Sequence, residues 1–313
     1  MLLPSLVGAI VPMLIYLFLL WKFDKNEPEP IKFIIFHFLY GATIAIVLGI
    51  IGSKIFSFPL IYIFSEETNN LLKVIIIAPI IEEIAKASLL FKTIKNKNTN
   101  NFTDGLIYGG AIGLGFGMIE NFLYFLLFSD SMETFIPLFL IRSCFSGVMH
   151  SLATATVGGL MSLAKYSSKS KFITLTSLGL LIAMSIHFIW NLSVSFTQTS
   201  IWGILFMVLI ILFFALTYYQ SIQFENKTIR KELVNEIPEN LLLHLTSEYK
   251  FKNDWFIKSK KNTFIKKSIL LAFRKHQVEI SVKNRELYMK EIEQLRLEIS
   301  ELIEINNNFK ADT

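Results

Sequence analysis

The chain has 313 residues, of which 53% are hydrophobic and 18% are charged, with a formal net charge of +5. This hydrophobic content is too high for an ordinary soluble domain, and the single cysteine, Cys144, excludes an intrachain disulfide or a cysteine-rich metal site. Because the apolar residues gather in runs of about 18 or more, the composition indicates a helical membrane protein.

Seven apolar runs are long enough to cross the hydrocarbon core as helices. We place them at 2–21, 32–52, 71–91, 105–128, 136–163, 174–196 and 201–219. The first run has no basic leader and continues into Trp21 and Lys22, so we interpret it as a retained helix rather than a signal peptide. Segment 54–64 is too short and interrupted for another span, and we expect it at the membrane interface. The predicted fold is an all-α integral membrane protein, a bundle of about seven transmembrane helices over 1–219 with a helical tail over 220–313.

Lysines alternate between the predicted loops. The first, third and fifth loops carry three lysines each, whereas the fourth and sixth carry neither lysine nor arginine. Positively charged loops stay on the cytoplasmic side of a cell membrane. We therefore predict that the N-terminus lies outside and that the tail is cytoplasmic.

The third run contains three charged residues, Glu82, Glu83 and Lys86. At helical spacing both acids can lie beside the lysine, and Pro79 predicts a kink with a free carbonyl near Ile75. One interpretation is an ion pair that only locks helices together. Two acids with one lysine leave one carboxylate without a partner, however, which suits a general base. Charged groups inside a membrane usually mark function, so we favour a catalytic site.

The fourth run has glycines at every fourth position and then two polar residues, Glu120 and Asn121. The glycines are Gly105, Gly109, Gly113 and Gly117. A stripe of small residues allows a neighbouring helix to approach closely, so we interpret these glycines as packing residues. Glu120, an acid in an apolar run, is a second candidate site residue, with Asn121 in support.

Two later runs contain histidines, His150 and His187. His150 is either a helix-bridging hydrogen-bond partner or a site residue. His187 and Asn191 are four residues apart and share a helix face, so together they can bind a water or a metal and stabilise an oxyanion. Arg142 lies near the outer half of the fifth run, where we expect it to extend to the interface.

These motifs, in this order, resemble the PrsW family of intramembrane proteases, which are relatives of the CAAX prenyl proteases. The resemblance covers about the first 200 residues and rests on five pieces. They are the acidic loop DKNEPEP at 24–30, Glu82-Glu83-x-x-Lys86, Phe116-x-x-x-Glu120-Asn121, His150, and His187-x-x-x-Asn191. The CAAX proteases have a histidine where Glu120 stands, so this departure argues against prenylated substrates.

The resemblance implies that Glu82 and Glu83 are essential acids and that His187 is the essential imidazole, with Asn191 assisting at the oxyanion. The wider superfamily has been described both as metal-dependent and as glutamic. We expect no cofactor and a water activated by glutamate, with a divalent metal as the open alternative. The implied substrate is a membrane-anchored protein.

The tail combines basic and aromatic residues. Between 250 and 275 it has nine lysines or arginines, one acid and five aromatic residues. This pattern predicts contact with the bilayer through anionic lipid rather than with nucleic acid; a solvated helix with a small core of its own is the alternative. Apolar residues then alternate by four and three at Tyr288, Ile292, Leu295, Ile299 and Leu302. This short seam predicts a helical hairpin or a homodimer contact.

Two other functions compete with the protease. Buried acids and histidines also form the relays of proton-coupled transporters, although we find no repeat that relates 1–104 to 105–219. A scaffold whose polar residues only join helices is the third possibility. It predicts that changing Glu82 or Glu83 impairs folding rather than activity.

Overall fold

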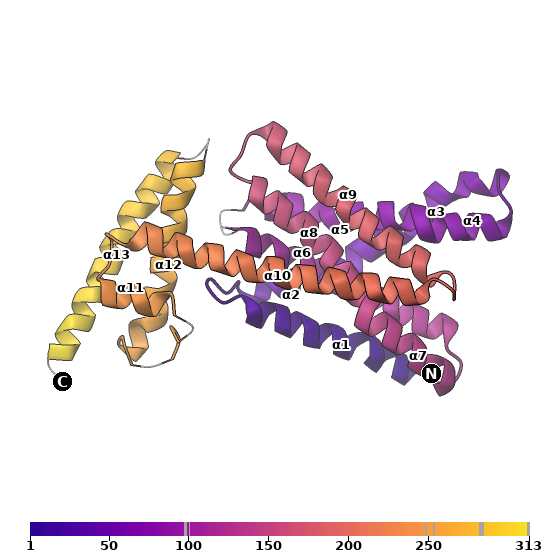
Figure 1. The fold of residues 1–313 in the computed structure, drawn as a ribbon, viewed down its shortest axis with the longest axis horizontal. Helices are drawn as coiled ribbons and strands as arrows, with labels where there is room; N and C mark the ends of the chain where they lie inside the picture. Colours follow the sequence, from indigo (N-terminus) through magenta and orange to yellow (C-terminus); the bar gives the residue numbers. More distant parts are fainter. Residues whose placement is uncertain (97–98, 100, 248, 253, 282–284, 312–313) are drawn as a thin grey trace. The chain divides into compact units, whose positions relative to one another are not determined.

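The computed structural model describes residues 1–96, 99, 101–247, 249–252, 254–281 and 285–311, and these residues contain helices and no strand (Figure 1). The chain divides into two compact units. The membrane unit comprises Met1–Asp24, Pro28–Lys165 and Lys169–Tyr218. The tail unit comprises Lys25–Glu27, Tyr166–Ser168 and Tyr219–Thr313.

Six helices in the described part of the chain are long and apolar enough to cross a membrane. They are α1 (Leu2–Phe23), the continuous helix Ile31–Tyr62, α6 (Phe102–Phe128), the continuous helix Met132–Ala164, α9 (Lys169–Val194) and α10 (Ser200–Leu233). The predicted class, a helical membrane bundle, is therefore confirmed.

The predicted span 71–91 is also helical but is not one of these six. It comprises α4 (Glu66–Leu72), a π-helical turn η3 (Lys73–Ile77) and α5 (Ala78–Thr93). Its apolar stretch contains Glu82, Glu83 and Lys86, so composition alone does not qualify it as a span. That this helix crosses the membrane stays a prediction.

Segment 54–64 continues the second helix as far as Tyr62 and forms no separate span, and its place at the membrane interface stays a prediction. The second helix continues through α2 (Ile31–Tyr40), a π-helical turn η1 (Gly41–Ala45), α3 (Ile46–Ser57) and a 3₁₀ turn η2 (Phe58–Tyr62). Pro59 lies at the start of η2 and does not end this helix.

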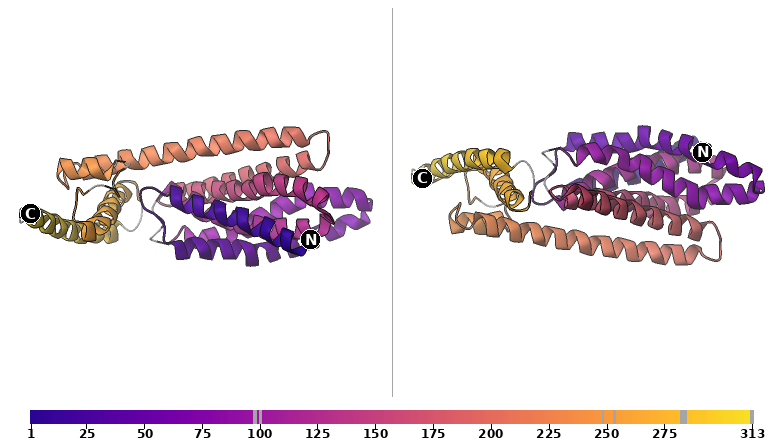
Figure 2. Two further views of the ribbon diagram at one scale, coloured as in Figure 1. Left: turned by 90° about the horizontal axis from the view of Figure 1, so that it is seen from below. Right: turned by 90° about the horizontal axis from the view of Figure 1, so that it is seen from above.

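Helix α6 lies at the centre of the membrane unit. Asn101 and Asp104 form a capping box at its start, and nearly every side chain from Thr103 to Gly117 is buried. The fifth predicted span is α7 (Met132–Ile141), a π-helical turn η4 (Arg142–Ser146) and α8 (Gly147–Ala164). Figure 2 shows the helices of this unit running side by side, with α10 at the edge. Only 11% of the most apolar stretch of α10 is buried, so this helix faces lipid.

The tail unit has a hydrophobic core of its own. It contains the end of α10, then α11 (Glu239–Leu245), α12 (Lys258–Ile280) and α13 (Arg285–Ala311). The seam residues Ile292, Leu295, Ile299 and Leu302 are buried in this core. Four of the five aromatic residues between 250 and 275 are buried as well. The seam therefore packs within the chain, as the hairpin alternative predicts, and the aromatic residues form a core.

Candidate active site

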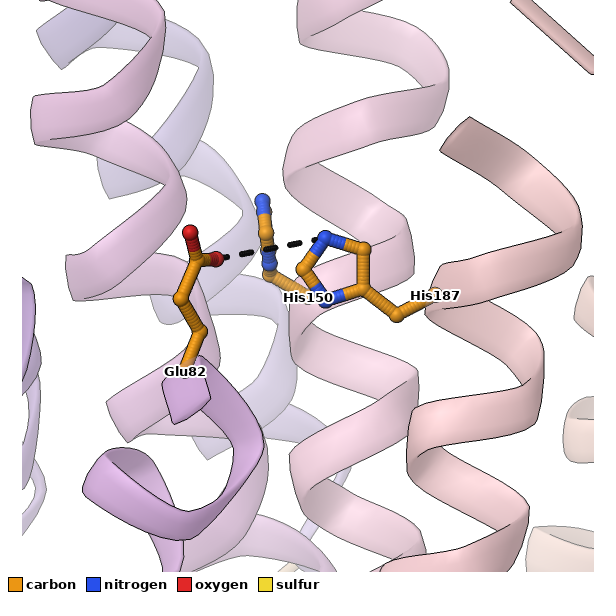
Figure 3. Close-up of side chains that lie close together, drawn as sticks. All are labelled: Glu82, His150 and His187. Atoms are coloured by element: carbon orange, nitrogen blue, oxygen red, sulfur yellow. Dashed lines mark ion pairs between the residues drawn. The ribbon is translucent and has the colours of Figure 1, made fainter. Parts of the chain in front are cut away.

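Three of the predicted site residues converge inside the membrane unit. Figure 3 shows Glu82 of α5, His150 of α8 and His187 of α9 pointing toward one another. One ligand atom of each lies within 4.8 Å of those of the other two, and both histidines are only 1% exposed. The sequence therefore brings an acid and two imidazoles from three helices to one buried point.

Glu83 is fully buried and receives three hydrogen-bond donors. Lys86 Nζ donates to its Oε1 at 2.5 Å, and His187 Nδ1 lies 2.9 Å from the same oxygen. Thr154 Oγ1 donates to Oε2 at 3.4 Å. A carboxylate beside an ammonium only accepts, so His187 Nδ1 must be the protonated nitrogen. When Nδ1 carries the only proton of the His187 ring, the lone pair of Nε2 is available.

The same reasoning defines the protonation of His150. Lys86 Nζ lies 3.0 Å from His150 Nδ1, and an ammonium has no lone pair to accept with, so Nδ1 accepts. The proton of the neutral ring is therefore on Nε2, which donates to Glu120 Oε2 at 2.7 Å. Both nitrogens of His150 are engaged, and its ring orientation is determined by Lys86 and Glu120.

Glu82 has a buried oxygen without a hydrogen-bond partner in the described part of the chain. Its Oε2 is buried and accepts no hydrogen bond from the described residues. The atom that faces it is His187 Nε2, at 3.9 Å. These two atoms are too far apart for a hydrogen bond, and a water about 2.8 Å from each would bridge them.

Arg142 is buried in the site, so our expectation that it extends to the interface is wrong. Its Nη2 donates to Glu120 Oε2 at 2.6 Å and its Nε to Asn121 Oδ1 at 3.0 Å. The Asn121 amide donates in return to the Arg142 carbonyl at 3.2 Å. The guanidinium also covers the ring of Tyr124 at 3.5 Å. Because a charge inside a membrane needs a partner, Glu120 within an apolar run was the sequence signal for such an arginine.

Asn191 does not contact the acids in any described hydrogen bond. Its Nδ2 donates to the carbonyl of Val74, in the π-helical turn η3, at 2.9 Å. In this turn the N–H of Ala78 bonds five residues back, to Lys73, so the next donor to Val74 would be Pro79, which has no N–H. Asn191 therefore satisfies the carbonyl that the proline leaves free. The predicted free carbonyl exists, one residue earlier than expected, because the turn is π-helical.

The glycine stripe of α6 packs against α8 and positions His150. A Cβ added at Gly113 would lie 2.1 Å from the carbonyl oxygen of His150. A Cβ at Gly105 would lie 2.2 Å from the carbonyl oxygen of Gly158. Only glycine permits this approach, so the interpretation of the stripe as a packing surface agrees with the structure.

A divalent ion has a partial ligand set here, formed by Glu82, His150 and His187. Two of the ligand atoms are free, Glu82 Oε2 and His187 Nε2. Bonds of about 2.1 Å in tetrahedral geometry place two ligand atoms about 3.4 Å apart, so a small closure of the 3.9 Å separation would be needed. His150 would have to exchange one hydrogen-bond partner for the ion.

A helical membrane bundle with a buried acid facing an imidazole has groups that a membrane-embedded hydrolase can use. The model of the PrsW-protease family, described as PrsW family intramembrane metalloprotease, matches residues 29–218. The chain belongs to this family and is an intramembrane peptidase, as the ordered motifs predicted. The comparisons give no support to the proton-coupled transporter.

Three bacterial relatives are similar to this chain over more than half of its length. Protease PrsW of Clostridioides difficile is 28% identical over 185 residues, which cover 58% of this chain and 76% of the relative. Protease PrsW of Geobacillus kaustophilus is 25% identical over 178 residues, 53% of this chain and 70% of the relative. Protease PrsW of Oceanobacillus iheyensis is 28% identical over 193 residues, 60% and 82% of the two chains. No solved structure matches the chain.

Proposed function

We propose that this intramembrane endopeptidase cleaves membrane-anchored proteins with a water held between Glu82 Oε2 and His187 Nε2. The observation that carries the proposal is that Glu82 Oε2 and His187 Nε2 face each other at 3.9 Å, while neither forms a hydrogen bond with the described residues. A water there would donate one proton to each, and its lone pairs would remain for attack.

Glu82 acts as the general base in this proposal. It takes a proton from the water, whose oxygen attacks the carbonyl carbon of the scissile peptide bond. When the C–N bond breaks, the proton on Glu82 passes to the leaving amine. The products are a new carboxyl end and a new amino end, so atoms and protons balance without a further reactant.

The other residues position this pair. Glu83 and Lys86 hold the His187 ring so that Nε2 faces Glu82. His150 links Lys86 to Glu120, which joins α5, α8 and α6 around the site. The family resemblance implies that Asn191 assists at the oxyanion. In this proposal Asn191 instead holds the carbonyl of Val74, and it could stabilise an oxyanion only after releasing that carbonyl.

A divalent ion would be held by Glu82, His187 and, after exchange of one partner, His150. When bound, such an ion lowers the pKa of its water and polarises the substrate carbonyl. Glu82 and His187 remain the groups that contact the water in either case.

The test is cleavage of a panel of membrane-anchored proteins by the purified full chain in detergent. Mass spectrometry identifies the new ends. Glu82→Gln removes the base without changing the shape of the side chain, and we expect it to abolish cleavage. Glu67→Gln, an exposed acid on the same continuous helix, is the matched control and should cleave normally. Wild-type cleavage by the Glu82 variant would refute the proposal.

We propose from the lysine alternation that the N-terminus lies outside the cell membrane and that the tail is cytoplasmic. Since Phe251 is the one aromatic residue of 250–275 that is exposed, a tail contact with anionic lipid would rest mainly on exposed lysines. Reporters fused after residue 220 and in the loop at Ser129 should lie on opposite sides. Finding both on one side would contradict this orientation.

A further inference from the structure

A cavity in the membrane unit lies apart from the acid–histidine site. It has a volume of about 420 Å³ and lies between α2 and the C-terminal end of α5. Lys92, in its wall, follows Glu82 by ten residues, which is about 15 Å along a helix. The volume falls within the range of about 300–1,000 Å³ that small-molecule sites occupy. The cavity is therefore large enough for a ligand that the proposed reaction does not use.

The mouth of this cavity is positively charged. Lys32 and Lys92 both line it, both are exposed, and neither forms an ion pair with any acid that the structure describes. Lys92 lies in the last turn of α5, where the helix dipole favours a cation. Lys32, in contrast, lies in the first turn of α2, which has no acidic residue and no side-chain cap. A cation at that end is unfavourable unless an anion joins it.

The remaining wall of the cavity has polar side chains and an apolar part that is continuous with the outer surface of α2. The polar side chains are His37, Thr93, Asn96, Thr99 and Tyr108. Phe33, Phe36 and Leu89 line the apolar part, and Phe36 is 54% exposed. Its neighbours Ile35 and Leu39 are also exposed, so this face of α2 faces acyl chains in a bilayer. A free phosphate would use only the charged half of such a site. A ligand with an anionic head and an apolar chain would use both halves.

We propose that this cavity binds the phosphodiester headgroup of an anionic phospholipid. Lys32 and Lys92 contact the phosphate, and the first chain segments lie against Phe36. The C-terminal end of α5 would be held in place by this lipid, and α5 also carries Glu82 and Glu83. A basic pocket between membrane helices on the predicted cytoplasmic side is a typical place for such a lipid.

The test uses the purified full chain in neutral detergent. Dihexanoyl phosphatidylglycerol, dihexanoyl phosphatidylcholine and inorganic phosphate are titrated separately, and the shift of the thermal unfolding midpoint gives each apparent affinity. We expect saturable stabilisation by the glycerol lipid alone. Lys32→Gln with Lys92→Gln should weaken it about thirtyfold. Lys22→Gln with Lys95→Gln, which removes the same charge outside the cavity, should leave it unchanged.

Three results would overturn the proposal. They are equal stabilisation by the choline lipid, equal stabilisation by inorganic phosphate, and a cavity variant that binds as the wild type does. Both cavity lysines are exposed, so the double variant should fold. If it does not, each single variant is measured instead, and each should weaken binding about fivefold.

Discussion

Replacing Gly113 by alanine tests whether the close contact between α6 and α8 positions the site. The new Cβ would lie 2.1 Å from the carbonyl oxygen of His150, and real Cβ atoms essentially never approach within 3.0 Å. Helix α8 must therefore move by at least about 0.9 Å at this point. Moving α8 away from α6 by this amount would stretch the hydrogen bond between His150 and Glu120 of α6, now 2.7 Å long, to as much as about 3.6 Å, beyond hydrogen-bond distance.

The expected result is a loss of both stability and activity. Overpacking of this kind costs about 1–3 kcal/mol, and a displacement of about 1 Å in a site can lower the rate about a hundredfold. Thermal unfolding in detergent measures the loss of stability, and cleavage of a substrate from the panel measures the loss of activity. Gly110→Ala is the matched control on the same helix, since its Cβ would meet only side-chain atoms, at 3.1 and 3.2 Å. If Gly113→Ala cleaves and unfolds like that control, the positional argument is refuted.

Three further changes test individual contacts. Arg142→Gln removes the charged hydrogen bond to Glu120, whose side chain is 18% exposed, so thermal unfolding should show a loss of about 1.5–3 kcal/mol; an unchanged midpoint would contradict this. Asn191→Ala leaves the Val74 carbonyl unbonded and should cost about 1–3 kcal/mol in the same assay; a large loss of rate with unchanged stability would indicate the oxyanion role instead. The hydrogen bond from Arg296 lowers the pKa of Glu236, so this carboxylate stabilises the tail above its unfolded pKa and stops doing so as pH falls through its folded pKa. The protection factors of tail amides against hydrogen exchange should fall below about pH 4 in the wild type, and Glu236→Gln should reduce this dependence.

The sequence predicted the helical membrane class and the convergence of acids and histidines because both follow from the free energy of burying polar groups in lipid. Glu82, Glu83, His150 and His187 are separated by up to 105 positions in sequence, yet each lies in an apolar run at similar depth. Arg142 was misplaced because its position in a run does not reveal whether the side chain points inward. Its partner Glu120 lies 22 positions away, on another helix.

The local backbone geometry of the helices could not be predicted from the hydrophobic periodicity of the sequence. The π-helical turns η1, η3 and η4 each shift the helical register by one residue within a predicted span, and no residue pattern marks such a shift. In the tail, basic and aromatic residues suit a lipid-facing helix and a small core equally well. The choice depends on which face meets a neighbouring helix, and here Phe264 and Phe273 are buried beside Leu295 and Ile299 of α13.

Whether cleavage needs a metal ion depends on whether a nitrogen of His150 can leave its hydrogen-bond partner. A three-ligand site needs one of its nitrogens, yet Nδ1 accepts from Lys86 and Nε2 donates to Glu120. Giving up a hydrogen bond to a charged group costs about 1.5–3 kcal/mol, which weakens an ion by about ten- to a hundredfold. We therefore expect cleavage to persist after treatment with a strong chelator and dialysis. His150→Gln, which can still accept from Lys86, should retain part of the activity, whereas His187→Gln should have none. If the chelator abolishes cleavage and zinc or another divalent ion restores it, the water is metal-bound, and Glu82, His150 and His187 are its ligands.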